Sequence, residues 1–284
     1  MSAFDRRLTP ARPDLAAEHL RGSVEADRYA VGQKLRVIEE VVDLRAEPRR
    51  DRGIDTQVLF GEEITVYEID EEGWAWGQAS RDSYVGYLPA STLAKETAAP
   101  THRVRAPRTF VYPVANMKEP VVMALPLGAE VAVASTRGDF AQVAGLGFVW
   151  ADHLAPGGSA APDFVAVAEF FLNAPYLWGG KTFAGLDCSG LVQVSLHAAG
   201  RASPRDTDMM RAGLGGEIPV GEDLAGLRRG DLVFWKGHVG IMRDAAELLH
   251  ANGHRMMVAS EPLRVARDRI AAKSFGEIVC VRRL

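Results

Sequence analysis

Residues 186–193 read LDCSGLVQ and place one of the two cysteines of the chain directly after an aspartate. Apolar residues then recur at helical spacing, and Gly200 stands where a helix would end. The pattern predicts Cys188 in the first turn of a core helix, where the helix dipole and the free backbone N–H groups favour a nucleophilic thiolate. Taken alone, the same pattern fits a small buried core residue at least as well, because free cysteines are among the most buried residue types.

Length and composition describe a folded protein of several domains. The chain has 284 residues, 47% of them hydrophobic and 25% charged, which predicts two or three domains. A net charge of −4 offers no basic surface, so we expect neither nucleic acid nor a membrane as a partner. The two cysteines form no disulfide framework and no Cys/His cluster has zinc spacing, so we expect no metal and no cofactor. Cys280, in the apolar run IVCV, is expected to be a buried core thiol.

The first thirty residues alternate charges and prolines and contain no apolar stretch of the signal-peptide type. We therefore expect a cytoplasmic protein, in which an unpaired cysteine stays reduced. Residues 1–30 are expected to form an extended arm with one short helix near residues 13–21. No segment is long enough to cross a bilayer.

Two blocks of short strand-like segments follow the arm. In residues 31–98, β-branched and aromatic runs alternate with Gly and Asp, which is typical of a small antiparallel barrel. Residues 103–156 repeat this order, since LGAEV at 127–131 echoes FGEEI at 60–64. Two degenerate copies predict duplicated domains rather than a solenoid, which needs at least about three repeats.

The remaining segment, residues 160–284, has a different pattern. Helical spacing within 162–172 and after Cys188 is followed by a polar loop at 201–217 and then by several strand-like runs. Helices first and strands later predict an α+β domain.

This last segment also contains candidate partners for Cys188. A cysteine nucleophile needs a base within hydrogen-bond reach and a third group that orients the base. His238 begins one predicted strand and His250 ends the next, so a hairpin would bring the two imidazoles together. His197 lies nine residues along the Cys188 helix, too far to reach the sulfur, and is expected to be structural.

Five ordered motifs carry a family resemblance: YLWGG at 176–180, DCSG at 187–190, GDLVF at 230–234, GHVGI at 237–241 and HA at 250–251. Within 163–284 they resemble the NlpC/P60 family of papain-like cysteine peptidases, which cut bacterial cell-wall peptides. The two upstream blocks resemble bacterial SH3-like (SH3b) domains. The resemblance therefore implies a multidomain fold, with two small all-β SH3-like barrels followed by an α+β papain-like domain.

The resemblance also implies catalytic roles. Cys188 would attack the scissile carbonyl, and His238 would take the thiol proton and later protonate the leaving amine. His250 would orient His238, with His254 as the competing candidate. The backbone N–H of Cys188 and the hydroxyl of Tyr176 would bind the oxyanion.

Further residues are implied to bind the substrate. A buried ammonium needs carboxylates around it, and Asp187, with Glu47 and Tyr84 from the first SH3b block, would bind a free amino terminus. Glu47 fits a solvated loop charge equally well, and Tyr84 fits a barrel aromatic equally well.

The remaining substrate contacts would come from three residues near the nucleophile. Ser189 and Thr207 would contact the substrate's carboxylate or backbone, and Trp178 would form an apolar wall. The family often has Ser where Thr207 stands, a departure that would tighten the pocket.

The arrangement as a whole is similar to γ-D-glutamyl-L-diamino acid endopeptidases, which recycle murein peptides. It implies a murein tri- or tetrapeptide as substrate, cut at the γ-D-Glu–diamino acid bond next to a free N-terminal L-Ala. Three alternatives stay open: a lysin that uses its SH3b domains to target intact peptidoglycan, a non-catalytic SH3b binding protein, and an acyltransferase or amidase. The preferred diamino acid and the oligomeric state are also open, with a monomer as the working expectation.

Overall fold

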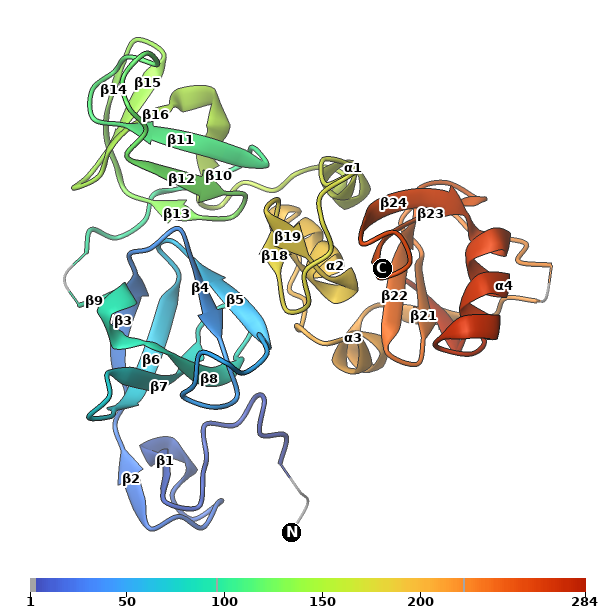
Figure 1. Cartoon of the computed structure of the whole chain (residues 1–284), viewed down its shortest axis with the longest axis horizontal. Helices are drawn as coiled ribbons and strands as arrows, with labels where there is room; N and C mark the ends of the chain where they lie inside the picture. Colours follow the sequence, from blue (N-terminus) through green and yellow to red (C-terminus); the bar gives the residue numbers. More distant parts are fainter. Residues whose placement is uncertain (1–3, 96, 222) are drawn as a thin grey trace. The chain divides into compact units, whose positions relative to one another are not determined.

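The computed structural model describes residues 4–95, 97–221 and 223–284, and the chain divides into two compact units, residues 1–157 and residues 158–284 (Figure 1). No helix within these described residues has both the length and the apolar character needed to span a membrane.

The arm at the start of the first unit is docked on the barrel that follows it. Strand β1 (Leu15–Ala17) pairs in parallel with β2 (Arg28–Ala30), and the segment between them begins with the 3-10 turn η1 (Glu18–Leu20). The short helix expected near residues 13–21 is therefore a strand and this turn. The Arg12 guanidinium lies 4.4 Å from the centre of the Trp76 ring and donates a hydrogen bond to the Tyr87 hydroxyl at 2.8 Å. Cation–π and polar contacts thus hold the arm in place.

The first barrel follows the arm. Its strands are β3 (Gln33–Val37), β4 (Val41–Leu44), β5 (Thr56–Leu59), β6 (Glu63–Ile69), β7 (Trp74–Ala79), β8 (Val85–Pro89) and β9 (Leu93–Ala94), with the 3-10 turn η2 (Ala90–Thr92) before β9. Five of them form a sheet in the order β8-β7-β6-β3-β9, and β4 pairs with β5. Inward-facing side chains, among them Ile64, Leu88 and Tyr84, form one core.

The second β block has the elements β10 (His102–Val104), β11 (Arg108–Tyr112), β12 (Met123–Pro126), β13 (Glu130–Val131), β14 (Val133–Arg137), β15 (Phe140–Val143), β16 (Gly147–Trp150), η3 (Ala151–His153) and β17 (Leu154–Pro156). Its pairings repeat those of the first barrel. The first strand pairs with the fourth and with the last (β3 with β6 and β9; β10 with β13 and β17), and the second pairs with the third (β4 with β5; β11 with β12). In both blocks a 3-10 turn precedes the last strand.

The two β blocks meet through backbone and charged contacts. The Glu130 N–H donates to the Phe60 carbonyl at 2.8 Å, and Gly61 (φ +81°) lies so close that a Cβ there would be 2.1 Å from the Glu130 carbonyl oxygen. Only glycine fits both that conformation and that distance. The Arg81 guanidinium is paired with Glu62 at 3.0 Å and with Glu130 at 2.7 Å, which joins the first block to the second.

The second unit contains four helices and one large sheet in its described residues. Its helices are α1 (Phe164–Glu169), α2 (Cys188–Ala198), α3 (Thr207–Gly213) and α4 (Leu263–Lys273). Its strands are β18 (Lys181–Thr182), β19 (Gly185–Leu186), β20 (Gly216–Ile218), β21 (Leu232–Trp235), β22 (His238–Met242), β23 (Glu247–Asn252), β24 (Met257–Pro262) and β25 (Cys280–Arg283). The antiparallel sheet has the order β20-β25-β21-β22-β23-β24. Figure 1 shows α2 and α4 on opposite sides of this sheet, and both contact β23.

Some details of this unit differ from the expectations. The segment expected to be a polar loop at 201–217 contains α3 and the start of β20, and α4 was not predicted. Cys280 is half-buried rather than a core thiol, because it lies on β25 beside the edge strand β20, and its thiol has Arg282 as a hydrogen-bond partner.

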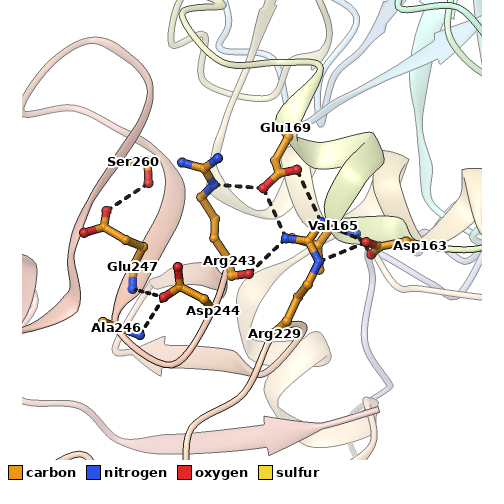
Figure 2. Close-up of polar contacts among 9 residues, drawn as sticks. All are labelled: Asp163, Val165, Glu169, Arg229, Arg243, Asp244, Ala246, Glu247 and Ser260. Atoms are coloured by element: carbon orange, nitrogen blue, oxygen red, sulfur yellow. Dashed lines mark hydrogen bonds and ion pairs between the residues drawn. The ribbon is translucent and has the colours of Figure 1, made fainter.

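An ion-pair network fixes the start of this unit to its sheet (Figure 2). Asp163 caps α1 by accepting a hydrogen bond from the Val165 N–H at 2.8 Å. Arg229 donates to Asp163 at 2.8 Å and to Glu169 at 3.2 Å, and Glu169 also accepts from Arg243 at 2.9 Å. Because Arg243 directly follows β22, the network ties α1 to the turn between β22 and β23.

Candidate active site

Cys188 is the first residue of α2 and is only 8% exposed. The carboxylate of Asp187, the N-cap residue, accepts a hydrogen bond from the Gly190 N–H at 2.6 Å, so the DCSG motif forms the helix start. The helix is buried from Cys188 to Leu196, which explains its mostly apolar sequence. The predicted core helix with the cysteine in its first turn is therefore present.

Gly190 allows this helix start to pack against the preceding segment. A Cβ atom at this position would lie 2.3 Å from the Gly180 carbonyl oxygen, far inside van der Waals contact. The Gly-Gly pair at 179–180 also contributes to this packing. The Gly179 N–H donates to Asp187 at 2.9 Å, and the backbone of Gly179 has a positive φ of 76°. The glycines of the YLWGG and DCSG motifs thus bring two backbone segments together beside the sulfur.

A buried arginine, not predicted from the sequence, pairs with Asp187. Arg205 is 1% exposed and donates to the two carboxylate oxygens of Asp187 at 3.0 and 2.7 Å and to the Ser189 hydroxyl at 2.7 Å. Asp187 therefore already accepts four N–H hydrogen bonds, which take up the acceptor sites of a carboxylate. Arg205 stands in a polar sequence segment, and nothing in its spacing distinguishes it from a surface charge.

The two histidines meet across neighbouring strands. His238 Nε2 lies 2.8 Å from His250 Nδ1, and His250 Nε2 lies 2.8 Å from the carboxylate of Glu261. All three side chains are buried. Glu261, on β24, was not identified from the sequence, because a single acidic residue on a strand reads as a solvated charge. The ring of Phe275 stacks on that of His238, with the ring centres 5.5 Å apart.

The nucleophile and the histidine pair lie on elements that pack together. Helix α2 packs on β22, and the Val239 N–H, directly after His238, hydrogen-bonds the Cys188 sulfur. The Thr207 hydroxyl, at the start of α3, lies 3.9 Å from the same sulfur. The Cys188 sulfur therefore lies against the start of the strand that carries His238, with the Thr207 hydroxyl on α3 beside it.

The titration of the site is dominated by burial. Burial and the Asp187 charge raise the pKa of the Cys188 thiol to about 11, against the hydrogen bonds from Val239 and Thr207. Burial, His250 and Arg269 lower the pKa of His238 to about 3. The resting pair is therefore a neutral thiol and a neutral imidazole. The prediction of a thiolate at the helix start is wrong in this respect, because desolvation outweighs the helix N-terminus.

The other residues predicted near the nucleophile differ in their exposure. Tyr176 is half-buried, and burial together with Cys188 and Asp187 raises its pKa, which keeps its hydroxyl a donor. Ser189 is buried, and its hydroxyl is engaged by Arg205, as described above. Trp178 is 68% exposed and forms part of the unit's surface. Whether these side chains contact a substrate stays a prediction.

Glu47 and Tyr84 belong to the first unit. Glu47 is half-buried and paired with Arg52, which lowers its pKa. Tyr84 is 4% exposed and lies in the core of the first barrel. Their contact with a substrate stays a prediction.

The remaining histidines lie apart from this arrangement. His197, on α2, has its Nε2 3.2 Å from the Ser203 carbonyl oxygen. His254 is exposed in the turn between β23 and β24, so the geometry brings His250, not His254, to His238. Among the residues that the structure describes, no group of three His, Cys, Asp or Glu side chains is placed to hold a metal ion.

Comparisons with known families match two parts of the chain. Residues 44–93 match the model of the bacterial dipeptidyl-peptidase Sh3 domain, and residues 173–272 match that of the NlpC/P60 family. The second match includes Cys188, His238, His250 and Glu261.

Individual proteins are similar over most of the chain. A γ-D-glutamyl-L-lysine dipeptidyl-peptidase of Bacillus subtilis (strain 168) is 32% identical over 228 residues, which cover 71% of this chain and 73% of the relative. A Bacillus cereus (strain ATCC 10987 / NRS 248) protein of the same name is 26% identical over 251 residues, covering 74% and 71%. The crystal structure of an NlpC/P60 family protein from Bacillus cereus ATCC 10987 superimposes with a TM-score of 0.73 at 19% identity, covering 88% of this chain and 99% of that one.

Proposed function

Because the chain belongs to the NlpC/P60 family of cysteine peptidases, we propose that it hydrolyses the γ-D-Glu–diamino acid bond of murein peptides with a free N-terminal L-Ala. The observation that carries the proposal is the buried set formed by Cys188, His238 and His250 inside the matched family domain. The similarity to two γ-D-glutamyl-L-lysine dipeptidyl-peptidases supports the choice of bond.

The proposed reaction starts from the neutral pair. As the Cys188 sulfur attacks the γ-carbonyl carbon of D-Glu, its proton passes to His238. The backbone N–H of Cys188 and the Tyr176 hydroxyl donate to the oxyanion. Collapse breaks the C–N bond, and the amine of the diamino acid leaves with the proton from His238. Water then hydrolyses the thioester, with His238 again acting as base, and releases L-Ala-γ-D-Glu.

Recognition of the free amino terminus is the specific part of the proposal. The dipeptidyl-peptidase names of the relatives support it, because removal of a dipeptide is measured from a free end. Asp187 already has four N–H donors, so its carboxylate has little remaining capacity for an ammonium group.

We further propose that residues 103–156 are a second SH3b domain. The support is the correspondence of strand pairings between the two β blocks, which extends to the 3-10 turn before the last strand. A shared pairing order over so many strands fits duplication better than coincidence.

The proposed setting is cytoplasmic recycling, with the enzyme acting as a monomer on released tri- and tetrapeptides. Cys188 and Cys280 are both unpaired, which is compatible with a reducing compartment.

The test compares L-Ala-γ-D-Glu-meso-diaminopimelate with its N-acetylated form and with intact peptidoglycan. We expect wild type to cleave only the free peptide, and Cys188→Ala to cleave none. The same peptides with L-Lys in the third position determine the diamino acid preference. Equal cleavage of the free and acetylated peptides, or release of fragments from intact peptidoglycan, would assign the chain to wall hydrolysis instead.

A further inference from the structure

The imidazole pair ends on a buried carboxylate that is itself held by an arginine. Glu261 is 4% exposed, and its register partner on β23 is Leu248, close to His250 along the chain. Arg269, on α4, donates to both carboxylate oxygens at 2.5 and 2.7 Å. Four side chains, His238, His250, Glu261 and Arg269, thus form one continuous hydrogen-bonded chain from β22 to α4.

The direction of hydrogen bonding along this chain follows from its acidic end. Burial opposes ionisation of Glu261, but hydrogen bonds from His250 and Arg269 hold its pKa well below the usual range, so it is a carboxylate that only accepts. His250 must then carry its proton on Nε2, which leaves its Nδ1 as an acceptor. His238 in turn must donate from Nε2 to His250. The one unprotonated nitrogen left in the neutral pair is Nδ1 of His238.

We propose that Glu261, held by Arg269, is a positioning residue that fixes the tautomers of both histidines and so makes Nδ1 of His238 the base for Cys188. Without an obligate acceptor at the end of the pair, the hydrogen bond between the two imidazoles could reverse its direction. His250 would then donate from Nδ1, and His238 would carry its proton on Nδ1, where it could not accept one. The carboxylate supplies orientation for a neutral pair, as the third member does in a Ser-His-Asp triad.

Other charges also act on this chain. Arg269 and Arg255 oppose protonation of His250, and Glu261 favours it. On the side of α2, the thiol of Cys188 is influenced by Asp187 and by Arg205. Of the charged groups acting on the histidines, Glu261 and Arg269 are members of the hydrogen-bonded chain itself. They are therefore the two residues to substitute.

The first test reads the tautomers without any substrate. In ¹⁵N-labelled wild type, long-range ¹H–¹⁵N spectra at neutral pH should show both His238 and His250 protonated on Nε2 only. Proton occupancy on Nδ1 of either ring would overturn the proposal. Because this result depends on no activity, its failure is separate from a failure of the proposed substrate.

The second test uses two variants with opposite expected shifts. Glu261→Gln removes a negative charge, so the histidine pair should protonate at lower pH than in wild type, by NMR titration and in the acid limb of kcat/KM. Arg269→Met removes a positive charge, so the same transitions should move to higher pH. Shifts in the same direction, or none, would contradict a role through charge and orientation.

The size of the kinetic effect gives a third measure. The side-chain amide that Glu261→Gln introduces can donate to His250 and reverse the chain, so kcat for this variant should fall at least about tenfold with KM nearly unchanged. The fall in kcat should stay below the roughly 10⁴-fold loss that the wrong tautomer causes in a Ser-His-Asp triad, because here the imidazole of His250 lies between the carboxylate and the base. The matched control is Glu169→Gln, which changes another arginine-bound carboxylate, that of the network in Figure 2, and should leave kcat unchanged. An equal loss in the control would overturn the assignment.

Discussion

Replacing Arg205 by methionine tests the buried ion pair beside the helix that carries the nucleophile. The guanidinium is 1% exposed and donates two hydrogen bonds to Asp187, at 3.0 and 2.7 Å, and one to Ser189, at 2.7 Å. Methionine keeps much of the aliphatic volume but leaves a buried carboxylate without its countercharge. Removal of one partner of such a pair costs about 3–5 kcal/mol, and we expect a loss of this size in the free energy of unfolding.

A second substitution separates the charge effect from lost packing. Asparagine at position 187 removes the charge and still accepts the Gly190 N–H bond that begins α2. In Arg205→Met/Asp187→Asn no unpaired charge remains. We therefore expect the double variant to be about 1–3 kcal/mol more stable than Arg205→Met alone, an effect opposite in sign to that of two independent losses.

The assay must report on the second unit alone, because the chain has two compact units. Hydrogen exchange of peptides from α2, followed through a urea titration, gives the local unfolding free energy. A double variant that is less stable than Arg205→Met would refute the reasoning. A loss below about 1 kcal/mol in the free energy of unfolding of Arg205→Met would also refute the reasoning, because an ordinary surface substitution costs nearly as much.

Further predictions follow from the packing and charges of the same unit. Gly190→Ala should cost about 1–3 kcal/mol, because its Cβ would meet a carbonyl oxygen at 2.3 Å, whereas Gly213→Ala, with nothing within 4 Å, should be neutral or slightly stabilising in urea unfolding. Arg229→Ala should cost no more than about 1 kcal/mol, and less in high salt, because this side chain is 39% exposed; a large, salt-independent loss would contradict this. Since the pKa of His238 is lowered to about 3, its unfolded form gains a proton first, and stability should fall by at least roughly 1.4 kcal/mol per pH unit as the pH drops from 6.5 toward 3, because the pKa of His250 is lowered as well; a flat profile would exclude a buried neutral imidazole. With its pKa raised to about 11, the Cys188 thiol should be alkylated by iodoacetamide at a rate that climbs steadily from pH 7 to 10, whereas a plateau across that range would indicate a resting thiolate.

Much of the site could be predicted because its signals are local. The aspartate before Cys188 is a helix cap, the apolar spacing after it is that of a buried helix, and Gly200 follows α2 with a positive φ. The hairpin that joins His238 and His250 likewise follows from two strand-like runs separated by a short turn. The family match confirms the SH3b character of the first β block, while that of the second stays a prediction.

The missed residues depend on contacts distant in sequence. Arg205 pairs with an aspartate 18 positions away, and Glu261 meets His250 from 11 positions along the chain. Burial cannot be read from a lone charged residue, because most such residues are solvated. The pKa of Cys188 was predicted in the wrong direction for a related reason, since the helix N-terminus is visible in the sequence and the surrounding desolvation is not. Helix α4 was missed although Leu263, Ala266 and Ile270 have helical spacing.

The most direct test of the central claim is to trap the acyl-enzyme. Wild type mixed with L-Ala-γ-D-Glu-meso-diaminopimelate and quenched in acid within the first turnover should gain the mass of L-Ala-γ-D-Glu less one water, with the adduct on Cys188 by peptide mapping. The Cys188→Ala variant should gain nothing. Cleavage of the peptide without an adduct, with the variant as active as wild type, would contradict the assignment of Cys188 as the nucleophile.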